Sequence, residues 1–567
     1  MRPARSEAET ATRRALEIEE QALGSDDVNV ARDLNKLALL LEETNRLQDA
    51  EPLLRRSIAI FEKNLGPNDP KVAVDLNNLA AILARQGKLG EAEQLVRRAL
   101  AIDEKSFGPQ HQNVANRLNS LAQVLQQLNR LEEAAAIQRR AIAIVEQTLG
   151  PENPMMAITL NNLAGLLGSM KQYREAGQLY RRSIAILEKT LGPNHPKLAT
   201  ALSNLAFTLE EQGEWEKAAV LRGRAMPMMI SANRSGSTRS TGTAANIKYY
   251  ARDLYHANPA DPGHLSQGFE GAQWALQNAA SSALALMSAR FSEGDTELAK
   301  LVRQQQDLIA EREKAYQSLD QAAGRADLEL ARQIRASISN FEGRLTGADA
   351  QIASRFPNYA DLAAPQPISI DAAQALLGDG EALIAFADIP DREENKGETL
   401  VFVLTKTKAL WNSVSLSRSG LQQSVSALRC GLDATLWQAG KESAGVCKKL
   451  LGLAANEDYS EARTPPFDAG LAHTLYRALF GPIETVIGNR SLVIVPSGAL
   501  TQLPFEVLVT QAPGEGRPRF EGYRSVTWLG QDHAITVLPS IGSLKALKTA
   551  KASPASSPRL LVLETRS

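Results

Sequence analysis

A repeat with a fixed period constrains this chain more than any other feature. The segment GPNDPKVAVDLNNLAAIL, which begins at Gly66, returns as close copies at Gly108, Gly150 and Gly192, and a more divergent copy begins at Gly24. The spacing is 42 residues each time. A period of this length is typical of stacked repeats, in which each unit buries its apolar face against its neighbours. Residues 24 to about 230 are therefore expected to form one stack.

Each repeat is expected to be a helical hairpin. Apolar residues recur at i, i+3, i+4 and i+7 over two segments of every copy, which indicates two amphipathic helices. Gly66, Gly108, Gly150 and Gly192 stand where a helix C-cap would, and Pro67 or Pro70 can end one helix and open the next. Small residues recur at intervals of 12 and then 7, as in Ala80, Ala92 and Ala99, and would let neighbouring helices approach closely.

This pattern of small residues resembles the tetratricopeptide repeat (TPR). The 42-residue period, the LGPxxP linkers and the LNNLA segments are similar to the long TPR variant of kinesin light chains and of many bacterial proteins. Ala8 and Ala15 fall where Ala50 and Ser57 fall one repeat later, so residues 1–230 are expected to hold a half repeat and five full repeats. Two explanations of the half repeat stay open: a true start that lies upstream, or a partner that caps this end.

The resemblance implies a superhelix whose first helices line a concave groove. It places the groove positions three residues before the first small residue of each repeat, at Asn35, Asn77, Asn119, Asn161 and Ser203. An Asn amide both donates and accepts, so a ladder of them can bind the backbone of an extended peptide. The predicted ligand is a protein or peptide. The alternative is that these side chains only tie neighbouring helices together.

Composition argues against other classes of partner. Lys and Arg number 63 against 64 Asp and Glu, without a block of like charge, so nucleic acid is not an expected partner. No stretch reaches the roughly 18 to 20 apolar residues of a membrane span, and the first twenty residues are charged. As written, the chain is expected to be cytoplasmic, and it is expected to be exported if the true start lies upstream.

No metal or cofactor is expected. Cys430 and Cys447 form no CxxC motif and have no His beside them, so they are interpreted as two ordinary thiols, and a disulfide would matter only in an exported protein. His111 and His195 lie in the linkers between repeats and are interpreted as loop residues rather than ligands.

The middle of the chain is expected to be a linker followed by a helical spacer. The Ser, Gly and Thr bias that begins at Ser231 predicts a flexible linker over residues 231–264. Residues 265–356 carry helical apolar stripes with a break at Gly324, which predicts an antiparallel hairpin that acts as a spacer or brace. A dimerising coiled coil, and hence self-association, is the alternative.

Residues 357–567 are expected to form an α/β region. Strands are predicted near residues 381, 399 and 409 as a meander, and near 491 and 533 in a mostly parallel sheet. The phrases PNYADL, EALIAF, LVIVPSGALTQLPFEVLV, ITVLPSIGSL and LLVL, in this order, resemble the CHAT family of caspase-like cysteine-peptidase relatives, which are commonly fused to TPR arrays. The predicted fold class is multidomain: an all-α TPR superhelix, a helical hairpin spacer and an incomplete caspase-like α/β region.

The family resemblance implies a His-Gly strand and an Ala-Cys strand after the LLVL run at 560–563, and neither is present. His473, His533, Cys430 and Cys447 are interpreted as structural, and Ser497 lies in a loop without the GxSxG pattern. No catalytic residue is therefore predicted.

Three functions follow from these observations. The leading one is a peptide-binding TPR scaffold with a catalytically incomplete CHAT region. The second is a cysteine peptidase whose catalytic half comes from a second chain. The third is pure scaffolding through the middle hairpin.

Overall fold

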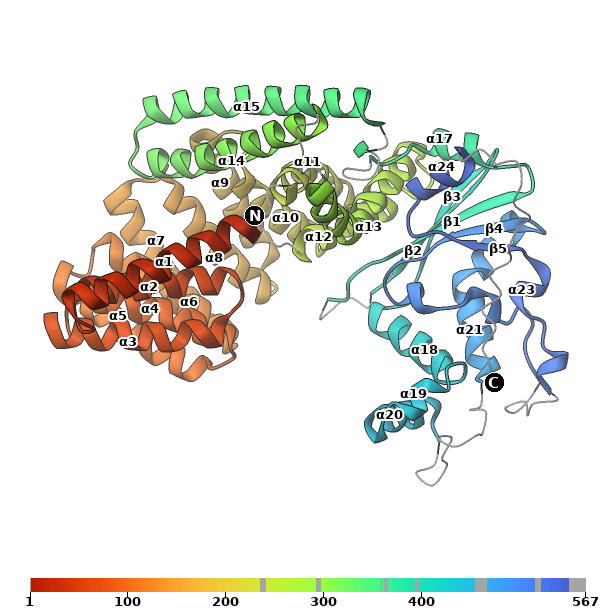
Figure 1. Ribbon diagram of the computed structural model, residues 1–567, viewed down its shortest axis with the longest axis horizontal. Helices are drawn as coiled ribbons and strands as arrows, with labels where there is room; N and C mark the ends of the chain where they lie inside the picture. The colour runs from red at the N-terminus through yellow and green to blue at the C-terminus, as the bar shows by residue number, and fades with distance from the viewer. Residues whose placement is uncertain are drawn as a thin grey trace. The chain divides into compact units, whose positions relative to one another are not determined.

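The computed structural model describes residues 2–234, 241–291, 297–357, 359–360, 366–392, 397–453, 467–514 and 522–549 (Figure 1). The chain divides into two compact units, one of residues 1–239 and 303–348 and the other of residues 240–302 and 349–567. The LLVL run at 560–563 lies outside the described residues.

The first unit is a stack of helical hairpins, as the repeat predicts. The first helices of the repeats are α2 (Val28–Glu43), α4 (Pro70–Arg85), α6 (Gln112–Gln127), α8 (Pro154–Ser169) and α10 (Pro196–Glu210). The second helices are α1 (Arg2–Leu23), α3 (Leu47–Leu65), α5 (Leu89–Phe107), α7 (Leu131–Leu149), α9 (Tyr173–Leu191) and α11 (Trp215–Arg234). Helix α1 packs against α2 as an unpaired second helix would.

The linkers between repeats set the helix ends. Gly66 and Gly192 follow α3 and α9 with φ of 92° and 93°, a conformation that strains residues with a Cβ. The side chain of Asp69 accepts from the backbone N–H of Lys71, and so caps the start of α4. His111 and His195 cap α6 and α10 in the same way, so both are loop residues as expected.

Charged pairs connect the second helices of neighbouring repeats. Each pair joins an Arg to a Glu that lies 36 residues earlier, and one pair occurs at every step of the stack. The pairs are Arg56–Glu20, Arg98–Glu62, Arg140–Glu104, Arg182–Glu146 and Arg224–Glu188. Exposed pairs of this kind contribute roughly 0 to 1 kcal/mol each.

The predicted antiparallel hairpin is confirmed, with α14 (Glu297–Gly324) and α15 (Leu328–Arg355) meeting just after Gly324. Residues 303–348 of this hairpin belong to the first unit. Tyr316, Leu319 and Ile338 are buried in the same apolar cluster as the last repeats. Part of the apolar face of the hairpin is thus packed against the last repeats of the stack.

The second unit is built on a five-stranded sheet of order β3-β2-β1-β4-β5. The strands are β1 (Glu381–Asp388), β2 (Thr399–Thr405), β3 (Ala409–Val414), β4 (Ser491–Val495) and β5 (Ile535–Val537). The first three form the predicted antiparallel meander, and β4 pairs parallel to both β1 and β5. The sheet is therefore mixed rather than mostly parallel, because the connections that join β1, β2 and β3 are shorter than the dozen or more residues that a parallel crossover needs.

Helices cover both faces of this sheet. On one face Phe269 of α13 (Pro262–Phe291) packs against Phe402, with ring centroids 5.8 Å apart. On the other, Phe386 is buried between Phe480 and Phe505, beside α18 (Arg418–Cys430) and α21 (Ala469–Leu479). The shorter helices are α17 (Ile370–Leu376), α19 (Thr435–Gln438), α20 (Lys441–Leu451), α22 (Glu484–Ile487), α23 (Leu529–Asp532) and α24 (Gly542–Thr549).

The flexible linker expected over residues 231–264 is largely wrong. Residues 235–240 lie outside the described residues, but α12 (Thr241–Ala257) follows them and α13 begins at Pro262. Ile247, Ala251 and Leu254 have helical spacing and are buried. Helices α12 and α13 belong to the same unit as the sheet, because this apolar stripe outweighs the polar bias of the preceding residues.

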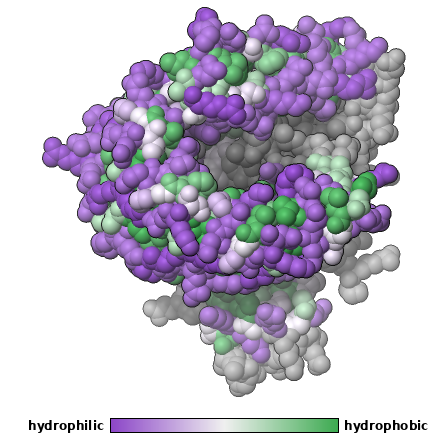
Figure 2. Space-filling view, turned by 90° about the vertical axis from the view of Figure 1, so that its left-hand side faces the viewer, coloured by the Kyte–Doolittle hydropathy of each residue, from purple (hydrophilic) through white to green (hydrophobic). Residues whose placement is uncertain are grey.

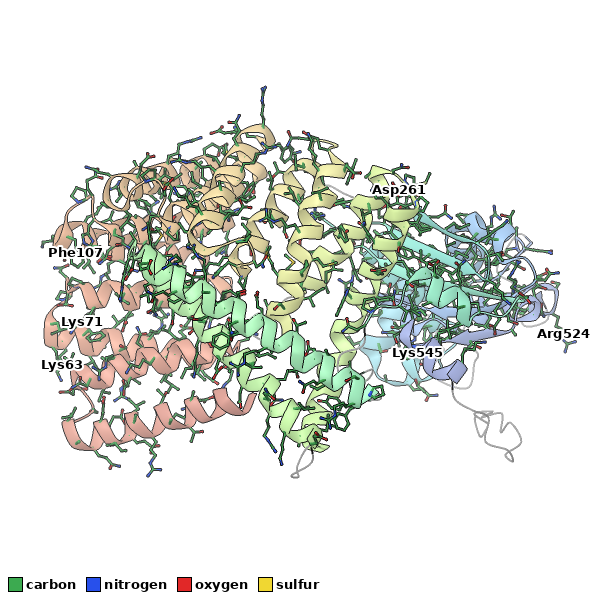
Figure 3. All side chains as sticks on the ribbon, turned by 90° about the horizontal axis from the view of Figure 1, so that it is seen from above. Lys63, Lys71, Phe107, Asp261, Arg524 and Lys545 are labelled. Carbon is green, nitrogen blue, oxygen red and sulfur yellow. A yellow bond between two sulfur atoms is a disulfide. The ribbon has the colours of Figure 1, made fainter. Side chains whose placement is uncertain are left out.

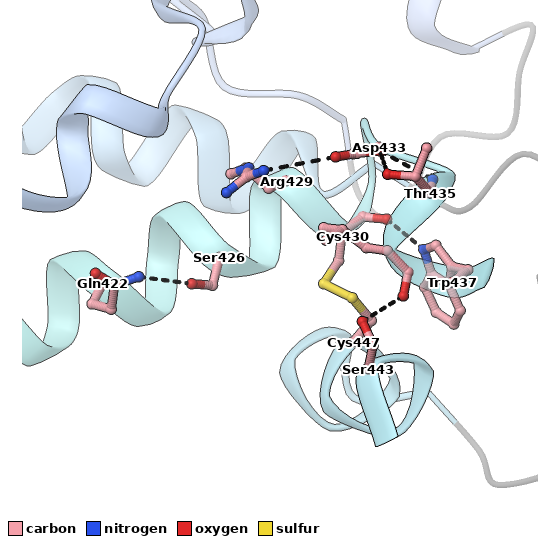
Figure 4. Close-up of a disulfide and its surroundings, with 10 residues drawn as sticks. Gln422, Ser426, Arg429, Cys430, Asp433, Thr435, Trp437, Ser443 and Cys447 are labelled. Carbon is pink, nitrogen blue, oxygen red and sulfur yellow. Dashed lines mark hydrogen bonds and ion pairs between the residues drawn. A yellow bond between two sulfur atoms is a disulfide. The ribbon is translucent and has the colours of Figure 1, made fainter. Parts of the chain in front are cut away.

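The expectation of two ordinary thiols is also wrong, because Cys430 and Cys447 form a disulfide with a Cα–Cα distance of 5.5 Å (Figure 4). It joins the end of α18 to α20. Trp437 of α19, which lies between them in the chain, donates from Nε1 to the Cys430 carbonyl at 2.7 Å and is buried. The segment that contains α19 brings the two cysteines together, and their spacing in the sequence does not reveal it.

Candidate functional site

The predicted ladder lies on the first helices of the stack, with one rung per repeat on α2, α4, α6, α8 and α10. Figure 2 faces the first repeats and shows a hollowed surface on which apolar patches lie among hydrophilic residues. The five side chains differ in how far the stack itself uses them.

The two end rungs are engaged by the stack. The amide of Asn35 donates to the carboxyl of Asp75 in the next repeat, and its Oδ1 accepts from Asn78 at 3.5 Å. At the other end, Ser203 donates to the carbonyl of Ala199 in its own helix at 2.8 Å. Asn35 therefore ties two repeats together, as the alternative interpretation of the ladder expects, whereas the hydroxyl of Ser203 is used within its own helix.

Asp75 holds the first rung in an unusual environment. Its side chain is buried, and Ser57 and Asn35 both donate to it. Burial raises the pKa of Asp75 to about 6, and the two hydrogen bonds oppose this rise by favouring the carboxylate. The orientation of Asn35 is therefore coupled to a carboxyl group that changes its charge near neutral pH.

The three central rungs keep unused hydrogen-bonding atoms. Asn119 Oδ1 accepts from Gln138 at 2.5 Å, and Asn161 Oδ1 accepts from Asn204 at 3.2 Å, but within the described residues neither amide nitrogen makes a hydrogen bond. The buried Oδ1 of Asn77 has no partner among the described residues. The central rungs are thus only half satisfied by the stack.

Exposed apolar side chains accompany the ladder, and the sequence analysis missed them. Val74 and Ile158 lie three residues before Asn77 and Asn161, on the same helix face, and are 44% and 40% exposed. Leu39, four residues after Asn35, is 38% exposed. The available signal was an apolar residue three or four positions from a ladder amide, which places both side chains on one helix face.

The family comparisons agree with this geometry. A model of the tetratricopeptide repeat matches residues 6–63, 71–147 and 155–230, and a model of the CHAT domain matches residues 469–567. The chain carries tetratricopeptide repeats and a CHAT domain. The CHAT match begins between β3 and β4, whereas the sheet itself begins at β1.

Several solved structures are similar to part of the chain. BtubC (BKLC) from P. vanneervenii is 23% identical, with a TM-score of 0.36 over 41% of this chain and 92% of that one. A putative kinesin light chain of Podosopora anserina is 25% identical, with a TM-score of 0.32 over 38% of this chain and 99% of that one. No curated protein matches the chain.

In the CHAT-containing unit, the four residues considered for catalysis have structural partners. Cys430 and Cys447 are bonded to each other, so neither offers a thiol. His473 Nδ1 lies 2.9 Å from the Val509 carbonyl, and His533 Nδ1 lies 2.7 Å from the Arg490 carbonyl. These residues do not form a nucleophile and base pair.

Ser497 is likewise a structural residue of this unit. It follows β4, is buried, and accepts at Oγ from the backbone N–H of Asp388 at 3.0 Å. The Asp388 carboxylate pairs with Lys248 of α12 at 2.6 Å. The carboxyl ends of β1 and β4 are thus joined by internal contacts.

The described residues also bear on other kinds of site. They contain no group of three or more His, Cys, Asp or Glu side chains placed to hold a metal ion. Within the same residues, every helix is too short or too polar to cross a bilayer.

Proposed function

We propose that the TPR stack binds a protein or peptide ligand in an extended conformation through Asn77, Asn119 and Asn161. The observation that carries this proposal is the set of amide atoms that the stack leaves unused at these three rungs. The amide nitrogens of Asn119 and Asn161 can donate to the C=O groups of a peptide backbone. The buried Oδ1 of Asn77 can accept from a peptide N–H once its side chain rotates toward the groove. Exposed Val74 and Ile158 on the same face offer apolar contacts to its side chains.

The expected contribution of the ladder can be stated. A hydrogen bond contributes about 0.5 to 1.5 kcal/mol net, and each 1.4 kcal/mol is a factor of ten in affinity. Replacing Asn77, Asn119 and Asn161 together by Ala should weaken binding by roughly one to three orders of magnitude. The helices should persist, because Ala is the better helix former.

The test begins with a ligand selected from random displayed peptides against the full chain, which is then titrated against the triple variant. A matched control replaces Gln21, Gln147 and Gln178 by Ala, because these are exposed amides on second helices. Loss of affinity in the ladder variant alone supports the proposal. Equal affinity in a ladder variant of unchanged helicity places the binding site elsewhere.

The CHAT region, in this proposal, acts without cleaving peptide bonds. The support is that the two cysteines are bonded to each other and that His473 and His533 lie against backbone carbonyls. We expect purified protein to lack peptidase activity. The alternative is a cysteine peptidase completed by a second chain, and cleavage that appears on mixing with the product of an adjacent reading frame would favour it.

The disulfide bears on where the protein folds. A bond between Cys430 and Cys447 persists in oxidising compartments and is rare in the cytosol, so it favours an exported protein over the cytoplasmic location expected from the sequence. Protein isolated from its natural source and then denatured without reductant should be alkylated at neither cysteine. Modification of both would favour the cytoplasm.

A further inference from the structure

One apolar position recurs along an edge of the stack and changes from buried to exposed. It is the last residue of the second helices α1, α3, α5, α7 and α9. These five residues, called the edge row below, are Leu23, Leu65, Phe107, Leu149 and Leu191. Leu191 is 2% exposed and Leu149 is half-buried. Phe107, Leu65 and Leu23 are 41%, 38% and 51% exposed.

The α14–α15 hairpin accounts for the buried end of the edge row. Leu191 lies in one apolar cluster with Tyr316 and Leu319 of α14. Polar contacts fix the hairpin on the same edge: Arg335 donates to the carbonyls of Lys189 and Thr190 at 3.2 and 3.0 Å. This edge thus binds the hairpin through apolar packing and through the carbonyls at the end of α9, which have no partner within their own helix.

A charged contact and the tip of the hairpin complete this interface. Asp320 of α14 pairs with Lys197, at the start of α10, at 2.8 Å. The turn of the hairpin reaches the linker before α8, where Asn153 donates to the Gly324 carbonyl at 3.2 Å. The hairpin therefore covers the edge of the fourth and fifth repeats.

The first three repeats lack this cover, and the junction between the first and second repeats carries the same two features. Lys71 is the counterpart of Lys197 three repeats earlier and is exposed, and Phe107 and Leu65 are the counterparts of Leu191. Figure 3 shows Lys63, Lys71 and Phe107 at one edge of the stack. The exposed surface is thus continuous, repeat by repeat, with one that is already used to bind helices.

We propose that the edge row over the first three repeats binds an amphipathic helix of a partner protein. The helix would resemble α14 in chemistry, with a stripe of apolar and small side chains packed on Leu65 and Phe107 and a carboxylate that pairs with Lys71. Continuity with the hairpin interface, and the recurrence of the Lys197 side chain at Lys71, carry this choice of partner. The surface lies at the helix ends and is separate from the ladder of amides.

The probe is a labelled synthetic peptide of residues 303–348, titrated against the full chain, whose own hairpin already occupies the fourth and fifth repeats. We expect saturable binding, and a loss of at least about tenfold in a Leu65→Ser, Phe107→Ser double variant, since buried anchors dominate such interfaces. The matched control is Val220→Ser, which removes a side chain that is 64% exposed on α11. Helicity and the thermal midpoint are measured for each variant to check folding.

Charge exchange tests the carboxylate. Lys71→Glu in the full chain should weaken binding of the peptide, and an Asp320→Lys change in the peptide should restore part of the lost affinity. Failure to restore it overturns the proposed ion pair. If the peptide shows no saturable binding, the proposed docking surface is overturned. It is also overturned if the peptide binds the double variant with equal affinity, because the peptide would then be displacing the resident hairpin. Self-association of the full chain that the double variant abolishes would assign the edge to a second copy and also overturn the proposal.

Discussion

The two units of this chain bury their cores in different ways. In the TPR stack, each hairpin packs on the next, so burial is divided over successive junctions. In the CHAT-containing unit, helices cover both faces of one sheet, and aromatic rings around Phe386 form its centre. The stack therefore presents an equivalent surface at every repeat, whereas the sheet unit depends on a single shared core.

Buried polar groups sharpen the difference. Asp75, Arg117 and Thr159 occupy the same buried position in three successive repeats, and each has different partners. Asp75 is bound by Ser57 and Asn35, and Arg117 pairs with Asp103 at 2.9 Å. A buried polar group destabilises the fold when its partner is missing. Each of these groups therefore favours stacking against the repeat that carries its own partner over stacking against another, similar repeat.

The largest expected effect is in the sheet core. Phe386→Ala should destabilise the second unit by about 3 to 5 kcal/mol, the usual cost of removing a fully buried ring. Thermal unfolding followed by far-UV and near-UV circular dichroism should show the sheet unit melting earlier while the helical signal of the stack persists. The comparison fails if both units lose stability together. Val537→Ala, at a side chain 48% exposed on β5, is the control.

The disulfide should matter only to the sheet unit. Its loop spans 17 residues, for which constraint of the unfolded chain stabilises by about 3 kcal/mol. Replacing Cys430 and Cys447 together by Ala should lower the free energy of unfolding of that unit by about this amount, and its denaturation midpoint should fall accordingly. A reductant should have no effect on the double variant. An unchanged midpoint would show that Trp437 and its neighbours hold α18 and α20 together without the bond.

Asp75 should give the stack a specific pH dependence. The pKa of Asp75 in the folded chain, about 6, lies above the ordinary value of 3.8, so the folded state holds this proton more tightly than the unfolded state. The resulting stabilisation, about 3 kcal/mol, is complete below about pH 3.8 and is lost as pH rises through about 6.

The measurement is denaturant unfolding between pH 4 and 7, comparing Asp75→Asn with the unchanged chain. The variant removes the titrating group, so the difference in stability between the two proteins should change with pH in this window. If the stabilities of the two proteins changed with pH in parallel, the pKa of Asp75 would not be raised by burial in the folded chain.

The smallest effect is expected on the outer surface of the stack. Arg98→Ala breaks the pair with Glu62 and should cost less than about 1 kcal/mol, because both side chains are partly exposed and screened. Salt at 1 M should remove most of the difference. A cost several times larger would show that the charged pairs, rather than the apolar junctions, hold the repeats together.

The elements that follow a repeating sequence pattern could be predicted from the sequence. The 42-residue repeat and the LNNLA segments located the helices of the stack, and the break at Gly324 located the turn of the hairpin. Helix α12 was missed because the polar residues from Ser231 obscured the buried stripe of Ile247, Ala251 and Leu254. The pairing of Cys430 with Cys447 depends on the turn around Trp437. The fate of each ladder amide depends on neighbours that differ between repeats, such as Asp75 for Asn35 and Gln138 for Asn119.

Hydrogen exchange of the full chain, with and without the selected peptide, tests the central claim most directly. If the TPR groove binds the ligand through its central rungs, protection on binding should concentrate in α4, α6 and α8, and the exchange of β1 to β5 should not change. The peptide itself should also be protected at the N–H groups that pair with the amides. Protection confined to the sheet unit, with α4, α6 and α8 unaffected, would contradict the account.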